Sequence, residues 1–323
     1  MSRVALLSNP RSTGNRALLP RVREYCAAHP EVFHYEVEDV SQIGEAIRTI
    51  ALIKPRIIAI NGGDGTVQAT LTELHSGRYF KDSPPPVAVL PNGKTNLIAL
   101  DLGATGDPLK ALQRVVDLSA QADFSDHVIE RELISLDNGT NAPVLGMFLG
   151  GAYLADVILY TRHKIYPLGL PNGLSHLLAA VLGLFAITFG LGGRALPRRP
   201  QPMRVSLIRQ GEYRGLFSVL IVTTLEKLLL STNTANGDRR PGRMKLLAVD
   251  DRIGAILRLV GASWRGTLGR NALAGVHFEQ GDVIRIEGDR SNIILDGELY
   301  EASNERPITL TSTRPVSFLR LAA

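Results

Sequence analysis

The chain has 323 residues, of which 45% are hydrophobic and 21% are charged, a composition that excludes a disordered chain. At about 150 residues per domain, this length predicts two domains. Cys26 is the single cysteine, which excludes a disulfide framework and a Cys-based zinc site and fits a reducing compartment. Lys and Arg exceed Asp and Glu by 36 − 31 = 5, and this mild basic excess favours anionic partners without identifying one.

The first third of the chain alternates strand and helix signals. Short apolar runs predict strands, and apolar residues at helical spacing between them predict helices. Asp107 and Pro108 form an N-cap and first-turn pair for a helix that carries Leu109, Leu112 and Val115. The order of these elements predicts a parallel three-layer α/β domain. The predicted strands lie at 4–7, 32–37, 57–60 and 87–90.

After about residue 128, strand signals follow one another directly and are separated by turn dipeptides. This pattern predicts an antiparallel all-β domain, a β-sandwich or a barrel. Helical segments interrupt it at about 153–190 and 252–274. The predicted strands lie at 133–136, 144–148, 205–208, 216–223, 246–249, 283–286 and 293–295.

Residues 174–193 contain no charged side chain and approach the length of a membrane-spanning helix. Glycines interrupt the stretch, so a buried or interfacial helix is favoured over a span. Arg194, Arg198, Arg199 and Arg204 follow it. An apolar helix that ends in a basic cluster could lie on an anionic bilayer, and the alternative is a buried helix with a solvated basic tail.

The strongest motif is Asn61–Thr66, with the sequence NGGDGT, between a predicted strand and a predicted helix. Glycines let the backbone approach a ligand closely, and the N–H groups at a helix start favour phosphate. A bare carboxylate repels phosphate, so Asp64 predicts a metal ion or a nearby cation. The motif is not a Walker sequence, because no Gly-Lys-Ser/Thr ends it. The alternative is a tight turn that needs glycine only for its shape.

Two further polar loops, 8–15 and 90–96, also follow predicted strands. In the second loop, Asn96 is positioned to cap a short helix over 97–102 that Gly103 would close. Loops at the carboxyl ends of parallel strands share one edge of the sheet. The three loops are therefore expected to converge there, on a ligand site.

A late acidic motif, Leu295–Glu298, has the sequence LDGE. Asp-Gly between two strand-like segments is by itself a strong hairpin-turn signal. The pattern alone therefore favours a turn role for Asp296 over a catalytic one.

Together, Asn9–Pro10, the glycine motif 62–66, the loop 91–99 and the LDGE sequence resemble the diacylglycerol kinase catalytic family. This family includes bacterial soluble lipid kinases, ceramide kinases and sphingosine kinases. The glycine motif alone is shared with NAD kinases, whereas the second loop and LDGE narrow the resemblance to lipid kinases.

The resemblance implies an ATP-binding α/β domain over 1–128, which the C-terminal segment 308–323 rejoins. A β-sandwich domain for the lipid substrate would span 129–307. The resemblance also implies an ATP- and Mg²⁺-dependent transfer of the γ-phosphoryl group to a hydroxyl of a membrane lipid such as diacylglycerol or ceramide.

By the same resemblance, Asp296 would be the general base that takes the proton from the lipid hydroxyl. Asp64 would bind Mg²⁺ with Asp126 in the same network, and Glu298 would join the catalytic set by organising the ion or its waters. The residues implied to bind the nucleotide are Asn9, Gly62, Gly63, Asp64, Gly65, Thr66, Gly93, Lys94, Thr95 and Asn96.

Three positions depart from the family pattern. Lys94 stands where a threonine commonly touches the nucleotide, and it could pair with phosphate directly. Residues 36–39 lack the threonine that often follows the second strand, which leaves the adenosine contact unassigned. At 241–244 the Asp of an Asp-Gly-Leu loop is missing, so a second, structural Mg²⁺ site is predicted to be absent.

Such a kinase would be cytoplasmic and peripheral on the inner face of the membrane, in contact with its lipid substrate and with anionic headgroups. An NAD kinase is the alternative enzyme, and a catalytically degenerate nucleotide- or lipid-binding protein is the alternative outside catalysis. Nucleic-acid binding is not expected, because no recognised motif accompanies the small basic excess. The histidines show no zinc-ligand spacing. The acceptor lipid and the oligomeric state stay open.

Overall fold

The chain forms two compact units. Unit 1 comprises Met1–Leu133, Val144–Gly146 and Thr313–Ala323, and unit 2 comprises Ile134–Pro143 and Met147–Ser312. In the computed structural model, the described residues are 3–80, 84–93, 96–140, 142–165, 200–208, 211–226, 243–269 and 272–321.

Unit 1 contains a six-stranded sheet in the order β2-β1-β3-β4-β17-β5. All neighbouring strands are parallel except β5, which runs antiparallel to β17. The C-terminal strand β17 lies between β4 and β5. Because β5 pairs with β17, unit 1 continues past the predicted boundary at residue 128. The strands are β1 (Val4–Ser8), β2 (Val32–Glu36), β3 (Ile57–Asn61), β4 (Val87–Val89), β5 (Val128–Arg131) and β17 (Val316–Leu319).

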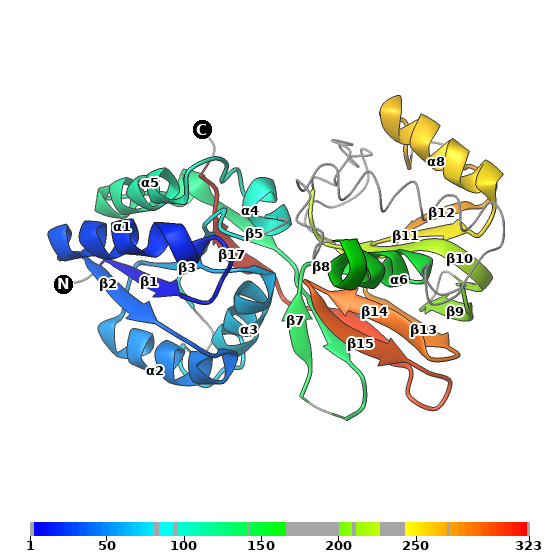
Figure 1. Ribbon diagram of the computed structural model, residues 1–323, viewed down its shortest axis with the longest axis horizontal. Coiled ribbons are helices and arrows are strands. Elements are labelled where there is room, and N and C mark those ends of the chain that lie inside the picture. The colour runs from blue at the N-terminus through cyan, green and yellow to red at the C-terminus, as the bar shows by residue number, and fades with distance from the viewer. Residues whose placement is uncertain are drawn as a thin grey trace. The chain divides into compact units, whose positions relative to one another are not determined.

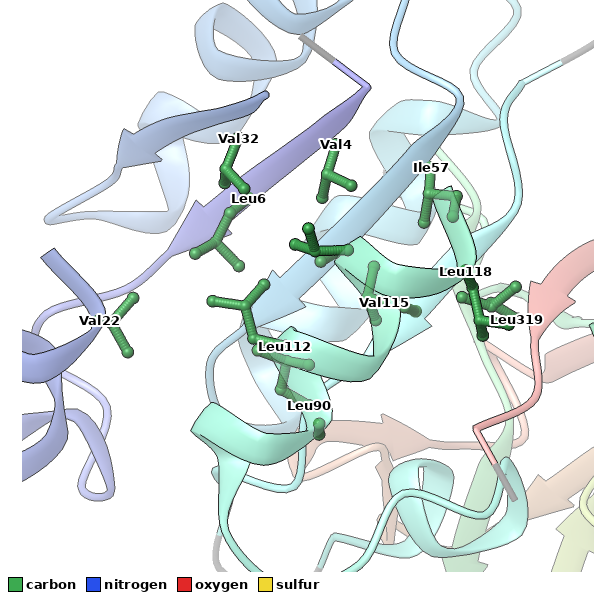
Figure 2. Packing of buried hydrophobic residues seen from close by; sticks show 14 residues of the cluster. Val4, Leu6, Val22, Val32, Ile57, Leu90, Leu112, Val115, Leu118 and Leu319 are labelled. Carbon is green, nitrogen blue, oxygen red and sulfur yellow. The ribbon is translucent and has the colours of Figure 1, made fainter. Parts of the chain in front are cut away.

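Helices cover both faces of this sheet, which confirms the three-layer prediction (Figure 1). On one face, Val4 and Leu6 of β1 and Ile57 of β3 pack with Leu112 and Val115 of α5 (Figure 2). Helix α1 joins the same face, and α2 and α3 cover the other (Figure 1). The helical elements are α1 (Asn15–Ala28), α2 (Ile43–Ile53), α3 (Asp64–Leu74), α4 (Leu97–Asp101), α5 (Pro108–Ala120) and the 3₁₀ turns η1 (Val40–Gln42) and η2 (Ser125–His127).

Local sequence explains where two of these elements lie. The side chain of Asp107 accepts a hydrogen bond from the Leu109 N–H (2.9 Å), and Pro108 is the first residue of α5, as predicted. The predicted strand over 144–148 is instead two strands, because Met147 breaks it. Its first part, β7 (Val144–Gly146), belongs to unit 1.

Unit 2 is built on antiparallel strands, as predicted, in the order β15-β14-β8-β10-β9-β13-β16-β6. Strand β11 pairs with β10, and β12 pairs with β11. The strands are β6 (Ile134–Asp137), β8 (Phe148–Gly151), β9 (Pro202–Leu207), β10 (Gly211–Thr223), β11 (Lys245–Asp250), β12 (Val276–Gln280), β13 (Val283–Gly288), β14 (Ser291–Leu295), β15 (Glu298–Ala302) and β16 (Ile308–Ser312).

The long strand β10 joins two groups of strands into one curled sheet. Its first part, Gly211–Leu216, pairs with β9. Its second part, Leu220–Thr223, pairs with β8 and β11. A register shift between Phe217 and Val219 marks the change of partner. The expected sandwich is therefore a single curled sheet that folds over at β10.

Within the described residues of unit 2, two helices accompany this sheet. Helix α6 (Tyr153–Tyr160) continues into the π-helical turn η3 (Thr161–Ile165), and α8 (Ile253–Trp264) packs on β11 and β12 (Figure 1). A search of the described residues finds no helix with the length and apolarity of a membrane span. The predicted apolar helix at 174–193 lies outside the described residues.

Candidate functional site

Three loops meet at the carboxyl edge of the unit 1 sheet, after β1, β3 and β4. The Asn9 N–H donates to the carbonyl of Asn61 (3.0 Å), and the Asn9 side-chain amide donates to the Thr66 hydroxyl (2.9 Å). Ser12 of the first loop accepts a hydrogen bond from the Gly63 N–H through its hydroxyl (3.0 Å). The predicted convergence of the three loops is therefore confirmed.

Three buried asparagines, Asn15, Asn61 and Asn92, hold these loops together, and none is more than 5% exposed. The Asn92 amide donates to the side-chain oxygens of Asn15 (2.5 Å) and Asn61 (2.6 Å). The Asn15 amide donates to the carbonyls of Asn9 (2.7 Å) and Asn61 (3.0 Å). Buried polar atoms need such partners, so the cluster fixes the relative positions of the three loops.

Sequence reasoning quoted these asparagines as parts of loops but did not select them as site residues. Asn61 and Asn92 each stand at or just beyond the end of a buried strand and directly before a glycine. An Asn directly before a glycine at a strand end was a usable signal, because its side-chain amide carries both donors and an acceptor and can bond to a neighbouring loop.

Polar contacts continue behind the cluster, from β1 to β2. The Asn61 amide donates to the Ser8 hydroxyl (3.1 Å), and Nε2 of His34 lies 2.9 Å from that hydroxyl. Arg23 donates two hydrogen bonds to Glu36 (2.7 and 2.6 Å), which hold the pKa of Glu36 below its usual value. Burial lowers the pKa of His34, against an opposing effect of Glu36. At neutral pH the His34 ring therefore contacts Ser8 in its neutral form.

Two glycines, after β3 and after β4, lie where an added side chain would be crowded. A Cβ on Gly62 would lie 2.7 Å from Cβ of Thr66, closer than real side chains approach. A Cβ on Gly93 would lie 3.2 Å from Oδ1 of Asn96 and 3.4 Å from Oδ1 of Asp64. The missing side chains leave backbone exposed beside a carboxylate, and this is a shape that a phosphate group can enter.

Asp64 is the first residue of α3, and the extended Gly63 precedes it as N-cap. N–H groups in the first turn of a helix have no intrahelical partner, and the helix dipole is positive there. The end of α3 thus suits an anion, whereas the Asp64 carboxylate suits a cation. The two preferences are compatible when a divalent cation bridges the carboxylate and a phosphate.

Asn96 was expected to cap α4, and it is the N-cap residue, but its side chain makes no hydrogen bond to the helix. Its backbone is left-handed (φ 51°), and its side-chain oxygen accepts a hydrogen bond from the Gly93 N–H (2.6 Å). The amide therefore closes the Gly93 turn instead of the helix. Lys94 and Thr95, between these residues, lie outside the described residues.

A buried ion pair that sequence reasoning missed ties this loop to the sheet. Arg131 of β5 lies with Nε 3.6 Å from Oδ2 of Asp101, the last residue of α4. The Asp101 side chain is fully buried and that of Arg131 is 12% exposed. Breaking such a pair would leave an uncompensated buried charge, so the pair holds the end of α4 beside β5.

Asp126, the other predicted Mg²⁺ ligand, lies in η2 and is exposed. Because β5 runs antiparallel to β17, its start at Val128 lies at the same sheet edge as the three loops. It is, however, two strands beyond β4. Among the described residues, no group of three or more His, Cys, Asp or Glu side chains is arranged around a metal position.

In unit 2, Asp296 and Gly297 form the turn between β14 and β15, and both have positive φ (44° and 93°). This is the hairpin that the Asp-Gly signal predicted. The Asp296 side chain is nevertheless buried, and it accepts hydrogen bonds from the backbone N–H groups of Met147 (2.8 Å) and Phe148 (3.0 Å). The carboxylate thus anchors the hairpin at the point where the chain enters unit 2.

Glu298, the second residue implied to be catalytic, begins β15 and is exposed. Beside it, the Gly297 carbonyl accepts a hydrogen bond from the Arg162 guanidinium (2.9 Å). The two late acidic residues therefore differ in setting, because one is buried and bonded to backbone and the other faces solvent.

Residues 3–124 match the model of the diacylglycerol kinase catalytic domain. This part of the chain is a diacylglycerol kinase catalytic domain. The match covers most of unit 1, including the three loops and α3, but not β5, β7 or β17. The chain therefore carries a kinase domain. Among curated proteins, no sequence matches it.

Solved structures match the whole chain in fold. A diacylglycerol kinase from Bacillus anthracis str. Sterne aligns with a TM-score of 0.61 at 15% identity, over 99% of this chain and 97% of that one. A provisionally named diacylglycerol kinase from the same organism gives 0.64 at 16%, over 97% and 94%. An NAD kinase from Archaeoglobus fulgidus in complex with ATP gives 0.48 at 12%, over 98% and 93%. The Bacillus structures establish that unit 2 also has the fold found in diacylglycerol kinases.

Proposed function

We propose that this protein is an ATP-dependent lipid kinase that transfers the γ-phosphoryl group to a hydroxyl of a membrane lipid. The observation that carries the proposal is the meeting of the three loops at the start of α3, within a diacylglycerol kinase catalytic domain. Phosphoryl transfer needs positioned phosphates, neutralised charge and an acceptor for the hydroxyl proton.

The phosphates of ATP are assigned to the cradle formed by Gly62, Gly63, Gly65 and Gly93. The Gly62 and Gly93 positions leave room for close approach, and the first turn of α3 offers N–H donors. Asn9 and Thr66, bonded to each other, form one wall. Asn96 closes the turn that presents the Gly93 backbone. Lys94 and Thr95 are assigned to the same phosphates from the sequence alone.

The residues beside this cradle fit a divalent cation. Mg²⁺ is commonly held by one or two carboxylates and by the substrate phosphates, and Asp64 is the carboxylate at the cradle. When bound, Mg²⁺ supplies charge neutralisation at the phosphates. Asp64 holds the ion at the start of α3 in this proposal, and Asp126 is assigned to the same network by resemblance alone.

Asp296 is assigned as the acceptor of the hydroxyl proton. Glu298 is assigned to organise the metal ion or its waters. The backbone N–H groups of Met147 and Phe148 donate to the two oxygens of Asp296 and hold its carboxylate in place, and an ionised carboxylate is a proton acceptor. A lipid acceptor resides in a membrane, so the proposal includes a peripheral encounter with a bilayer and its anionic headgroups.

The test is phosphate transfer from γ-labelled ATP to a panel of lipids in mixed micelles. The panel contains diacylglycerol, ceramide, sphingosine, monoacylglycerol and undecaprenol, with NAD as the soluble acceptor. Label in one lipid supports the proposal and names the substrate. Label in NAD alone would move the chain to the NAD kinases, and bound ATP without any transfer would favour a degenerate binding protein.

Two variants connect the assay to the site. Asp64→Asn is expected to reduce transfer by at least about a hundredfold, because it removes the negative charge assigned to the cation. Asp117→Asn, at an exposed aspartate on α5, is the matched control and should transfer label at the wild-type rate. Equal rates in the two variants would remove Asp64 from the proposed mechanism.

A further inference from the structure

Helix α8 carries apolar side chains on two different faces. Its inner face, with buried Ala255 and Ala262 and partly buried Leu259, packs into a cluster with Val249 of β11 and Val276 of β12. This face completes a core in the usual way. The outer face is also apolar, and nothing in the packing of the sheet requires that.

The outer face consists of Ile253, Leu257, Val260 and Trp264, which are 40%, 62%, 55% and 90% exposed. We call these four residues the α8 stripe. Their spacing of four, three and four residues places them along one line of the helix, within about 60° of its circumference. Elsewhere in the described part of the chain, strongly exposed large apolar side chains occur at most once per helix or strand.

Positive charge borders the α8 stripe, and negative charge is absent from α8 itself. Arg258 and Arg265 are exposed and share one flank of the helix, and exposed Arg252 precedes its first turn. Gly254 and Gly261 separate that flank from the stripe. Cβ atoms at these glycines would lie 3.6 Å from the guanidinium groups of Arg258 and Arg265, so the arginine stems lie along the helix surface.

We propose that the α8 stripe docks this protein on an anionic lipid bilayer, with α8 lying in the plane of the interface. A line of apolar side chains bordered by arginines is the pattern by which interfacial helices insert into the headgroup region. Trp264 stands at the end of the stripe, and tryptophan prefers the boundary between headgroups and acyl chains.

The proposal rests on the proposed function, because a lipid acceptor is what brings this chain to a membrane. The docking proposal goes beyond the proposed function because it assigns the membrane contact to α8. Residues 174–193, for which an interfacial helix was one of two interpretations of the sequence, lie outside the described residues. A bilayer fits better than a protein partner, because the stripe is a ridge on one convex helix and a fluid surface can close around a ridge.

The experiment uses Trp264 as its own probe, because it is the single tryptophan of the chain. Vesicles of phosphatidylglycerol mixed with phosphatidylcholine are added to the full-length protein. The emission is expected to shift to shorter wavelength and to be quenched by brominated acyl chains, and the protein should sediment with the vesicles. Phosphatidylcholine alone should bind several-fold more weakly, because the arginines then lack partners.

The variant Leu257→Gln/Val260→Gln should weaken vesicle binding by about tenfold or more, since it removes two of the four apolar contacts and keeps good helix formers. Leu52→Gln is the matched control, because Leu52 is 80% exposed on α2 of unit 1, and its binding should equal that of the wild type. Arg265→Gln should weaken binding to anionic vesicles only, and Arg48→Gln, an exposed arginine on α2, should not.

Three results would overturn the proposal. The first is an unchanged Trp264 spectrum with anionic vesicles, and the second is equal binding by Leu257→Gln/Val260→Gln and Leu52→Gln. The third is a spectral shift that depends on protein concentration without lipid, which would assign the stripe to a second copy of the chain.

A dispersed short-chain acceptor separates this proposal from the proposed function. Label in that acceptor without vesicle binding would overturn docking and keep the kinase. Vesicle binding without label in any acceptor would support docking and overturn the kinase.

Discussion

Two Asp-Gly pairs, one in each unit, contain the aspartates to which the proposal gives its main roles, and the chain around each pair is held differently. Asp64–Gly65 starts α3, and the surrounding loops are held by the buried amides of Asn15, Asn61 and Asn92. Asp296–Gly297 turns a hairpin, and the Asp296 carboxylate itself anchors that hairpin to the backbone. In unit 1, residues other than Asp64 hold the loops. In unit 2, Asp296 both anchors the hairpin and is the residue assigned to proton transfer.

The difference decides how each turn can be tested. Where neighbours hold a loop, the assigned residue can be changed with little effect on folding, and loss of activity reports chemistry. Where the assigned residue also holds the turn, loss of activity reports chemistry and structure together. The unit 1 site can therefore be dissected by single substitutions, but the unit 2 residue needs a stability measurement beside every rate.

The largest expected effect is that of Asn92→Asp in unit 1. The substitution replaces the donor amide with an oxygen that faces the oxygens of Asn15 and Asn61. Those amides cannot turn to compensate, because their nitrogens already donate to Asn9, Asn61 and Ser8. We expect unit 1 to lose about 3–5 kcal/mol of stability and to lose ATP binding.

Urea unfolding measures this loss, with Cys26 as a reporter of unit 1. Burial raises the pKa of the Cys26 thiol to about 11, so thiol labelling is slow while α1 is folded. Asn138→Asp is the matched control, since the Asn138 side-chain oxygen accepts two hydrogen bonds from Thr140 and an Asp retains these. Equal stability of Asn92→Asp and Asn138→Asp would show that the asparagine cluster does not hold the loops.

The second test compares Asp296→Asn with Asp64→Asn. An amide at 296 can accept only one of the two backbone hydrogen bonds and turns a donor toward the other N–H, so we expect a loss of about 2–3 kcal/mol. Asp64→Asn removes a charge at a helix start and should cost about 1 kcal/mol or less. Urea unfolding beside the lipid kinase assay checks both, and equal destabilisation would contradict the contrast between the units.

The third test concerns Gly14, which no motif selected. A Cβ on Gly14 would overlap the Asn92 side chain and lie 2.7 Å from the Asn92 carbonyl oxygen. Gly14→Ala should therefore cost about 1–2 kcal/mol and weaken ATP binding through the displaced loop. Gly44→Ala, in α2, meets nothing closer than 3.6 Å and should stabilise unit 1 by a few tenths of a kcal/mol or more. Thermal unfolding of the two variants should shift in opposite directions.

Sequence could predict the features that local pattern determines. The apolar runs of β1, β3 and β4, the cap at Asp107 and the Asp296–Gly297 hairpin all follow from residues within a few positions of each other. The convergence of the three loops also follows, because strand ends of a parallel sheet share one edge.

Features that depend on distant partners could not be predicted in this way. The asparagine cluster joins positions 15, 61 and 92, the Asp296 carboxylate reaches residues 147 and 148, and β5 belongs to unit 1 only because β17 returns from the end of the chain. The sequence around each of these residues does not indicate which distant residue it contacts. Asn96 is the N-cap residue of α4 as predicted, but its side chain bonds to the Gly93 N–H behind it and not to the helix ahead of it.

The smallest expected effect is a pH dependence at the opposite end of α3 from Asp64. His75 ends this helix, and burial lowers its pKa from 6.5 to about 4. Below pH 6.5 the unfolded chain binds a proton at His75 that the folded unit does not, so stability falls as the pH falls. Between pH 6.5 and 5.5 we expect a loss of about 1 kcal/mol from this group. The pKa of His34 is lowered too, so it adds to the total loss with the same sign.

His75→Phe isolates the His75 share, because it keeps a ring in the same place and cannot bind the proton. Urea unfolding at pH 6.5 and 5.5 should show a smaller acid loss in this variant than in the wild type, by about 1 kcal/mol. Asp64→Asn should keep the wild-type loss, because His75 is unchanged in it. An identical pH dependence in His75→Phe and the wild type would mean that α3 opens at its C-terminal end before His75 is protonated, and the helix that positions Asp64 would then be less firmly held than its buried neighbours suggest.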